Sequence, residues 1–399
     1  MAHVEILLHA VVAFSIGAHA LMMVLVYVGP ARRLRRRSKL PASEKSEVSA
    51  GPVEVSIFKP LAGVDDDLVE NLESFAHLRG PSYELLLGVA STDDPAFDVA
   101  KRFIARHPNR PFRLILTEPN AAVNPKVAQL IGIERQARGT IFVVSDSNVR
   151  VDDSYLETLA DRLSNPNVGL VSNVIVGSGE RTLGAALENY ILLTHVAPGV
   201  ISTAVFGRPI TIGKSLAMWR SDLESLGGFR ALGFYLAEDH ALARWMGKTG
   251  RKVVVEPTPI ENRNRDGGLA RPFRRHSRWA KIRRSMCPVA FWFEPLLHPV
   301  VVAALVLAVV PSTTTVGLLA VAVMSELVVD AASILRLRGF KALWLVHLLP
   351  FKALFMFVCY CRALVSRRVT WRGNALRVTR DSRLVTANDQ IPLAVGSDS

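Results

Sequence analysis

The stretch Ile141-Phe-Val-Val-Ser-Asp-Ser-Asn-Val-Arg-Val151 decides which fold we expect for this chain. Its apolar half, Ile141 to Val144, is typical of a buried parallel strand. The apolar run stops before Asp146, and the ligands of open α/β sheets bind beyond the carboxyl ends of the strands. A carboxylate at that position can bind a divalent metal that holds a diphosphate. The alternative is that Asp146 caps a helix beginning near Asp153.

The composition indicates a globular middle between membrane segments. Of the 399 residues, 50% are hydrophobic, and the apolar excess lies at the two ends of the chain. The net charge is +13, and the Lys and Arg clusters stand beside the apolar runs, as expected for contact with an anionic membrane surface. We see no nucleic-acid module signature and expect no nucleic-acid partner. The three cysteines lack metal-ligand spacing, which suits a reducing cytosolic face.

The N-terminal segment predicts an uncleaved membrane anchor. Residues 4–28 have the length and hydrophobicity of one span, and a basic run follows at 32–39. By the positive-inside rule that basic end faces the cytoplasm. A signal peptide would carry its positive charges before the apolar core instead. We therefore expect an anchor over residues 1–30 and a basic juxtamembrane linker over 31–52.

Residues 53–270 alternate between strand and helix patterns with short connections, which predicts a parallel, doubly wound α/β sheet. The expected strands are 53–58, 83–90, 112–117, 141–145, 168–176 and 252–256. The expected helices are 65–78, 95–106, 125–137, 153–163, 182–193 and 240–247. The polar loop 262–269 contains two glycines and is a candidate lid.

The C-terminal third predicts membrane contact. Residues 271–294 mix arginines with Trp and Phe, as an interfacial helix does. Residues 295–366 are expected to hold membrane segments, with a two-span hairpin at 296–310 and 316–335. The segment 343–364 has basic flanks and carries Pro350 and Lys352 in its middle, so a re-entrant or interfacial hairpin fits better than one span. Glu326 and Asp330 lie inside the second span, either paired structurally or functional. Residues 367–399 are expected to form a cytosolic tail.

Four features occur in order along the chain: Asp93-Asp94, Asp146, Glu238-Asp239, and Arg275-His-Ser-Arg278-Trp279. This order resembles the inverting GT-A glycosyltransferases, in which three aspartate positions precede a (Q/R)xxRW motif. The closer resemblance is to the ceramide glucosyltransferase family, over about residues 53–373. Further matching motifs are Phe58-Lys-Pro-Leu-Ala-Gly-Val64, Asn71-Leu-Glu-Ser-Phe75, Asn124-Pro-Lys126, Thr194-His195 and Thr370-Trp-Arg-Gly373. The chain departs from the animal pattern at Asn148, where glycine is usual, and in Gly213-Lys-Ser-Leu.

The resemblance implies a GT-A, Rossmann-like catalytic domain and a set of site residues. The implied donor-binding residues are Asp93, Asp94, Lys126, Asp146, Arg275, Arg278 and Trp279, with Asp146 also holding Mn²⁺ or Mg²⁺. His195 and Trp279 are implied for the acceptor. Inversion needs a base opposite the leaving group, and the resemblance assigns that role to Asp239, with Glu238 as its rival.

Each of these residues also has a structural alternative. Asp93 or Asp94 would cap the helix at Pro95, and Asp239 would cap the helix that follows it. Lys126 would be a solvated lysine in the first turn of a helix, and His195 a structural histidine at a helix end. The arginines and Trp279 would form the face of an interfacial helix.

The expected function is transfer of a hexose, glucose first, from a UDP-sugar to the primary hydroxyl of ceramide, giving a β-glycoside. A hopanoid or other membrane-lipid glycosyltransferase is the enzymatic alternative, and the apolar segments are too few for a processive polysaccharide synthase. A non-catalytic scaffold would have lost acidic positions that this chain retains. We expect an integral protein of a bacterial inner membrane, with the catalytic domain on the cytosolic face.

Overall fold

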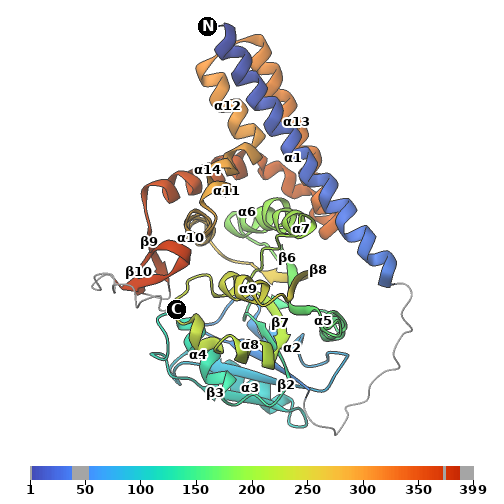
Figure 1. The fold of residues 1–399 in the computed structure, drawn as a ribbon, viewed down its shortest axis with the longest axis vertical. Coiled ribbons are helices and arrows are strands. Elements are labelled where there is room, and N and C mark those ends of the chain that lie inside the picture. The colour runs from blue at the N-terminus through green and yellow to red at the C-terminus, as the bar shows by residue number, and fades with distance from the viewer. Residues whose placement is uncertain (1, 38–53, 372–373, 387–399) are drawn as a thin grey trace.

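The computed structural model describes residues 2–37, 54–371 and 374–386, so most of the predicted linker and part of the last family motif lie outside it. A rod of three helices stands on an α/β body (Figure 1). The rod consists of α1 (Ala2–Arg37), α12 (Pro299–Val309) and α13 (Thr313–Leu337). The N-terminus lies at the end of the rod that is far from the body.

The body is built on an eight-stranded sheet with the strand order β3-β2-β1-β4-β7-β6-β8-β5. The strands are β1 (Val55–Pro60), β2 (Tyr83–Val89), β3 (Phe112–Leu116), β4 (Ile141–Ser145), β5 (Val149–Arg150), β6 (Val168–Ser178), β7 (Ser215–Trp219) and β8 (Lys252–Arg263). Strands β1 to β4 are parallel as predicted, and β6 pairs in parallel with β8.

The prediction of a wholly parallel sheet was wrong, because β7 runs antiparallel to both β4 and β6 and β5 runs antiparallel to β8. The chain enters β7 at the edge where β4 ends, so Ser145 pairs with Ser215. The amide of Asp146 accordingly donates to the carbonyl of Lys214. The reversed strand therefore brings Lys214 beside the residue on which the sequence analysis centres.

Helices cover both faces of the sheet. Alternate residues of β1 belong to two different apolar clusters, one on each face. Val55 and Ile57 belong to one apolar cluster and Phe58 to another, as the strand period of two requires. The covering helices are α2 (Leu68–Glu73), α3 (Pro95–Arg106), α4 (Pro125–Glu134), α5 (Tyr155–Leu163), α8 (Arg220–Ser225) and α9 (Glu238–Lys248). Helices α3 and α4 begin with a proline and are capped by Asp94 and Asn124, so both N-termini follow local sequence.

Two predicted helices have different ends in the structure. The helix expected to end near Leu193 continues from α6 (Leu183–Ile191) through a π-helical turn, η1 (Leu192–Val196), into α7 (Ala197–Val205). The predicted interfacial helix is two helices, α10 (Ala270–Met286) and α11 (Pro288–Phe293). It breaks at Cys287 because Pro288 lacks the amide hydrogen that would continue α10.

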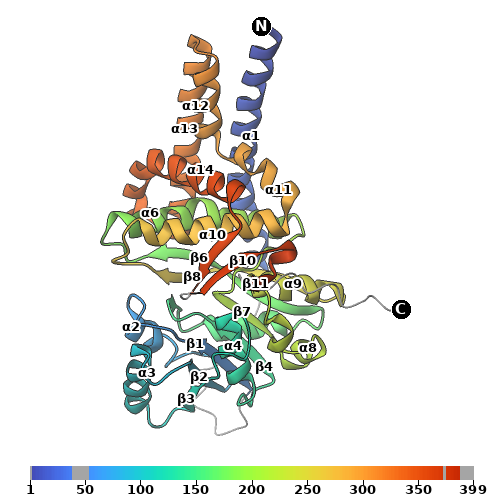
Figure 2. The ribbon, with the colours of Figure 1, turned by 90° about the vertical axis from the view of Figure 1, so that its left-hand side faces the viewer.

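Within the part of the chain that the structure describes, three helical segments have the length and composition to cross a membrane: His3–Met22, Thr313–Leu337 and Phe340–Val365. A bent pair, Pro288–Leu297 with Pro299–Val309, would add a fourth if its 75° bend belongs to one broken span. The third segment comprises the 3₁₀ stretch η4 (Phe340–Leu348) and α14 (Leu349–Val365). Both views show α14 lying across the base of the rod, above α10 (Figures 1 and 2). That the segment Phe340–Val365 is re-entrant or interfacial, and not a single span, stays a prediction. The position of α14 across the base of the rod agrees with it.

Three charged residues of the candidate membrane segments, Glu326, Asp330 and Lys352, are paired with one another. Lys352 is buried, and its Nζ lies 2.9 Å from Glu326 Oε1 and 2.5 Å from Asp330 Oδ2. Glu326 and Asp330 of α13 therefore share Lys352 of α14. This is the structural pairing that was one of the two expectations for these carboxylates.

Part of the predicted tail is folded. Strands β9 (Arg368–Trp371), β10 (Asn374–Val378) and β11 (Leu384–Thr386) form a small antiparallel sheet. Val369, Leu376, Val378 and Leu384 pack there against Leu236. The carbonyl of Ser382 accepts from the amide of Leu236 at 2.9 Å, and the amide of Ser382 donates to Ser285 Oγ on α10 at 3.0 Å. The C-terminal sheet therefore supports the segment that leads into α9.

Candidate active site

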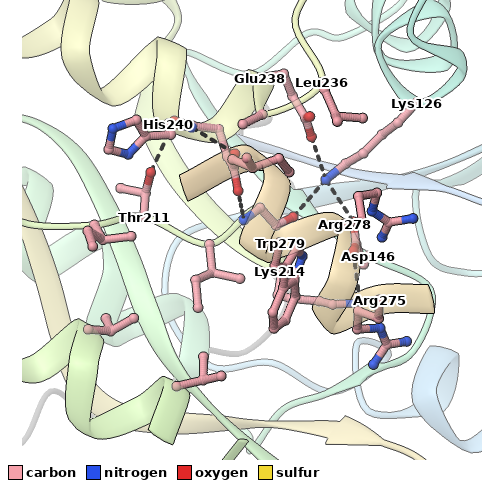
Figure 3. A pocket seen from close by; sticks show the side chains of 18 of the residues that line it. Lys126, Asp146, Thr211, Lys214, Leu236, Glu238, His240, Arg275, Arg278 and Trp279 are labelled. Atoms are coloured by element: carbon pink, nitrogen blue, oxygen red, sulfur yellow. Dashed lines mark hydrogen bonds and ion pairs between the residues drawn. The ribbon is translucent and has the colours of Figure 1, made fainter. Parts of the chain in front are cut away.

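A cavity of about 460 Å³ lies beyond the end of β4, between the sheet and α10. Eight of the residues singled out in the sequence line it, and Figure 3 shows most of them converging from separate elements. They are Lys126, Asp146, His195, Glu238, Asp239, Arg275, Arg278 and Trp279. The structure therefore brings together residues that are up to 153 positions apart in the chain, from Lys126 to Trp279.

Asp146 lies between two lysines. Its Oδ1 is 2.9 Å from Lys126 Nζ, and its Oδ2 is 3.0 Å from Lys214 Nζ. Desolvation opposes ionisation of this carboxyl, but the two ammonium groups outweigh it and hold the pKa of Asp146 well below its usual range. Asp146 is therefore ionised at neutral pH, and no helix-capping contact is found for it among the described hydrogen bonds.

Lys126 is buried, so the alternative of a solvated lysine is wrong. Its Nζ also lies 3.0 Å from Glu238 Oε1 and donates to the carbonyl of Gly213 at 2.8 Å. Burial would lower the pKa of Lys126, but Asp146 and Glu238 together raise it above its ordinary value. The Lys126 ammonium therefore links Asp146, which follows β4, to Glu238, the first residue of α9.

Lys59, which was not predicted as a site residue from the sequence, is fully buried in β1. Its Nζ donates to the carbonyl of Asp146 at 2.7 Å and lies 3.9 Å from the centre of the Phe75 ring. Burial lowers the pKa of Lys59 to about 7. A lysine inside the mostly apolar strand 55–60 was a signal for this role, because buried lysines are rare unless they have a partner.

Among the described hydrogen bonds, the Asp239 carboxylate accepts from two backbone amides. Its Oδ2 accepts from the amide of Gly213 at 2.5 Å, and its Oδ1 from the amide of His240 at 2.7 Å. Desolvation is the largest effect on this group, and it raises the pKa of Asp239 above the usual value. Its neighbour Glu238 is bound instead by Lys126 and, at 3.3 Å, by Asn124 Nδ2. Among the described contacts, a cationic side chain binds the carboxylate of Glu238, and none binds that of Asp239.

Helix α10 places Arg275, Arg278 and Trp279 along the cavity. Arg275 Nη1 is 2.8 Å from Glu188 Oε1 of α6, and His276 Nε2 is 3.4 Å from the same oxygen. Burial alone would raise the pKa of Glu188, but these two partners lower it to about 2. Burial together with the nearby Arg275 lowers the pKa of Arg278 to about 10, at which it is still a cation at neutral pH. The α6 carboxylate therefore fixes the basic face of α10.

His195 lies in the π-helical turn η1 and not at a helix end, which corrects the prediction of its position. Its ring stacks on His298 at a centroid distance of 5.0 Å. Burial holds the pKa of His195 well below its usual value, so the imidazole is neutral. The ligand atoms of His195, Glu294 and His298 lie within 4.8 Å of one another. Because Arg283 already donates to both oxygens of Glu294, this trio is charge-balanced without a metal.

Asp93 and Asp94 do not line the cavity. Asp94 caps α3 by accepting from the amide of Ala96 at 2.9 Å, as the structural alternative expected. It also accepts from the amide of Gly63 at 2.9 Å, and this loop contributes Ala62 to the cavity wall. Asp93 is exposed on the surface. Donor binding by Asp93 and Asp94 stays a prediction. Its support is that Asp94 binds the loop that contributes Ala62 to the cavity wall.

The predicted lid is shorter than expected and is tethered. Asn262 and Arg263 belong to β8, which leaves 264–269 as the loop. Asp67 forms ion pairs with Arg263, at 2.9 Å, and with Arg265. Arg271, just beyond the loop, lies 2.8 Å from Asp66. These contacts fasten the loop to the segment before α2.

A divalent ion, which the GT-A fold implies, fits the oxygen donors at the end of β4. Asp146 Oδ2 and Asn148 Oδ1 both bind the ammonium of Lys214, at 3.0 and 2.6 Å. Two oxygens of an Asp-x-Asn triplet thus already share one cation, and hard oxygen ligands of this kind suit Mg²⁺ or Mn²⁺. Asp146 and Asn148 are the residues that would hold the ion.

Comparison with known proteins gives the family. The chain matches Glycosyl transferase family 21 over residues 8–384. Ceramide glucosyltransferase 1 of Caenorhabditis elegans is 26% identical over 356 residues, covering 86% of this chain and 75% of the relative. Ceramide glucosyltransferase 3 of the same organism is 28% identical over 61% of this chain and 53% of the relative.

A solved structure confirms the predicted GT-A fold. It is a mannosyltransferase from Pyrobaculum calidifontis in complex with GDP-Man and Mn²⁺. The two chains align with a TM-score of 0.50 at 20% identity, covering 90% of this chain and 98% of that one. The family match over residues 8–384, nearly the whole sequence, shows that the chain belongs to glycosyl transferase family 21.

Proposed function

We propose that the protein is a membrane-bound inverting glycosyltransferase that moves a hexose, glucose first, from a UDP-sugar to the primary hydroxyl of ceramide. The observation that carries this proposal is the position of Asp239. Its carboxylate is fixed by the amides of Gly213 and His240 in the cavity that Asp146, Arg275 and Arg278 also line. A fixed base and a cationic diphosphate site in one cavity are what inverting transfer needs.

In the proposed reaction Asp239 takes the proton of the acceptor hydroxyl as its oxygen attacks the anomeric carbon. The bond from that carbon to the diphosphate oxygen breaks, and UDP leaves from the opposite face of the sugar. Lys126, Arg275 and Arg278 supply positive charge where the leaving group gains negative charge. A divalent ion held by Asp146 and Asn148 would add Lewis-acid neutralisation of the diphosphate.

The composition of the cavity wall supports a lipid acceptor. One part of it is apolar and comes from η1, α7 and α10, with Val196, Val200, Ile282 and Met286 as examples. Helix α10 lies beneath α14, and α7 lies beside α1 at the base of the rod (Figures 1 and 2). Trp292 and Phe293 of α11 are more than 60% exposed, as expected for side chains that meet a bilayer interface. His195 and Trp279 would then meet the acceptor head group, with the catalytic body on the cytosolic face.

The test is a product assay with purified protein in detergent and Mn²⁺. Ceramide and bacteriohopanetetrol are offered separately with UDP-glucose, UDP-galactose, UDP-N-acetylglucosamine and UDP-glucuronic acid, and the lipids are read by mass spectrometry. We expect a glucosyl-ceramide that is lost in Asp239→Asn. Product only on the hopanoid would replace the acceptor, and failure of every UDP-sugar to bind would overturn the proposed function.

A further inference from the structure

Asn148 and Lys214, which come from distant parts of the chain, are in direct contact. Lys214 Nζ donates to Asn148 Oδ1 at 2.6 Å, although the two residues are 66 positions apart. The same nitrogen lies 3.0 Å from Asp146 Oδ2. Asn148 and Lys214 therefore form one unit with Asp146, at the end of β4 where the donor diphosphate is proposed to bind.

Lys214 occupies the position that a metal ion needs. Its side chain is only 13% exposed, and its ammonium is shared by the Asp-x-Asn oxygens that would hold the ion. The other oxygen of Asp146 faces Lys126. A divalent cation approaching Asp146 would be repelled by both ammonium groups at short range. Binding of the ion therefore requires Lys214 to move away.

A displaced Lys214 needs another anion, and two carboxylates of the cavity, Glu238 and Asp65, already have partners, while Asp239 accepts from two backbone amides. Glu238 pairs with Lys126, and Asp65 accepts from Ser147 and lies 3.6 Å from Arg271. A nucleotide diphosphate brings new negative charge to the same place. It can receive the ammonium of Lys214 at the moment when the metal takes its oxygens.

We propose that Lys214 is a built-in cation of the Asp146–Asn148 site, which makes metal binding depend on the nucleotide diphosphate. In the donor-free enzyme it neutralises the site and keeps free divalent ions out. When a metal–diphosphate arrives, the metal takes the two oxygens and Lys214 turns to the diphosphate. The inference rests on the proposed function, because it takes the donor to be a nucleoside diphosphate sugar.

The test measures Mn²⁺ binding by electron paramagnetic resonance, with and without UDP, for the full-length protein in detergent. For the wild type we expect Mn²⁺ affinity to rise at least tenfold when UDP is present. For Lys214→Met we expect affinity without UDP to rise at least tenfold over the wild type, and the effect of UDP to shrink accordingly. Lys252→Met removes an exposed lysine at the start of β8 and serves as the matched control, with wild-type behaviour expected.

Two outcomes separate this inference from the proposed function. If wild-type protein binds UDP and Mn²⁺ together but Lys214→Met binds Mn²⁺ no better than the wild type without UDP, the inference is wrong and the proposed function stands. If wild-type protein binds no UDP with Mn²⁺ present, the proposed function fails first. Lys214→Gln keeps a hydrogen-bonding side chain and replaces Lys214→Met if the latter does not fold, with the same shift expected.

Discussion

Asp239 and Glu238 are adjacent carboxylates whose surroundings differ. Asp239 is bound by two backbone amides, whereas Glu238 is bound by Lys126 and Asn124. We predict that Asp239→Asn lowers kcat by about 10²- to 10⁴-fold, the usual contribution of a positioned base, while UDP-sugar affinity stays within a few-fold. Product formation and calorimetric titration of the donor measure the two quantities. A Glu238→Gln variant with the larger loss in kcat, beside an active Asp239→Asn, would reverse the assignment.

The same residue sets an expected pH dependence. A base must be ionised to act, and desolvation raises the pKa of Asp239. Activity therefore falls as pH is lowered through that raised pKa, so the acid limb of kcat lies above the ordinary aspartate value of about 3.9. A pH–rate profile of the wild type checks this. The residual activity of Asp239→Asn should lack that limb.

Helices α6 and α10 are joined by Glu188 and Arg275, a buried pair outside the rod. We predict that Glu188→Gln lowers the free energy of unfolding by about 3–5 kcal/mol at pH 7, because Arg275 loses its buried partner. Since the pKa of Glu188 is lowered to about 2, its stabilisation is complete above the unfolded value of about 4.3 and disappears as pH falls toward 2. Thermal unfolding in detergent should show the gap between variant and wild type narrowing over that pH range. A constant gap would show that the loss is not electrostatic.

The loop 264–269 is tethered through Asp67, a residue with a positive φ of 56°. The Asp67 carboxylate has a lowered pKa because Arg265 and Arg263 outweigh its desolvation. We predict that Asp67→Ala releases the loop and speeds tryptic cleavage after Arg265 by at least several-fold. Asp67→Asn is the matched control. Asparagine tolerates the positive φ at this position, so this variant differs from the wild type only in the charge of the side chain. Equal cleavage in Asp67→Ala and the wild type would show that the loop is held by other contacts.

At the scale of elements, local sequence predicted strands β1 to β4, because apolar runs and capping residues are local properties. The convergence of Asp146, Asp239 and the α10 motif was implied by the family resemblance, which rests on the order of motifs along the chain. The antiparallel direction of β7 was not predictable in the same way, because the pattern of a buried strand is the same in both directions. The π-helical turn at His195 was missed because nothing in the apolar run 191–201 marks a one-residue insertion in a helix. Lys214 was noticed only as a departure, since its contact with Asn148 depends on the direction of β7.

At the scale of the whole molecule, the rod and the body are joined by buried polar groups. The Tyr190 hydroxyl of α6 donates to Asp330 of α13, and Arg338 lies 3.0 Å from Glu180. Lys352 completes the joint from α14 by pairing with Asp330 and Glu326.

We predict that Lys352→Met lowers stability by about 3–5 kcal/mol, because it leaves two buried carboxylates without their cation. Thermal unfolding of the full chain in detergent measures the loss. The triple variant Lys352→Met, Glu326→Gln, Asp330→Asn should recover much of it, because no uncompensated charge remains. Recovery would be absent if Lys352 acted only through the shape of its side chain.

The small sheet formed by β9, β10 and β11 holds the segment before Glu238 through the backbone of Ser382. A ribosome makes those strands after every helix of the rod and after α14, so the nascent chain acquires this support last. The segment that leads into Asp239 is therefore fully anchored only once the candidate membrane helices have been synthesised. Completion of the proposed active site therefore depends on synthesis of these last strands. A polypeptide released before residue 382 would contain every proposed catalytic residue but would lack the hydrogen bond from Leu236 to Ser382.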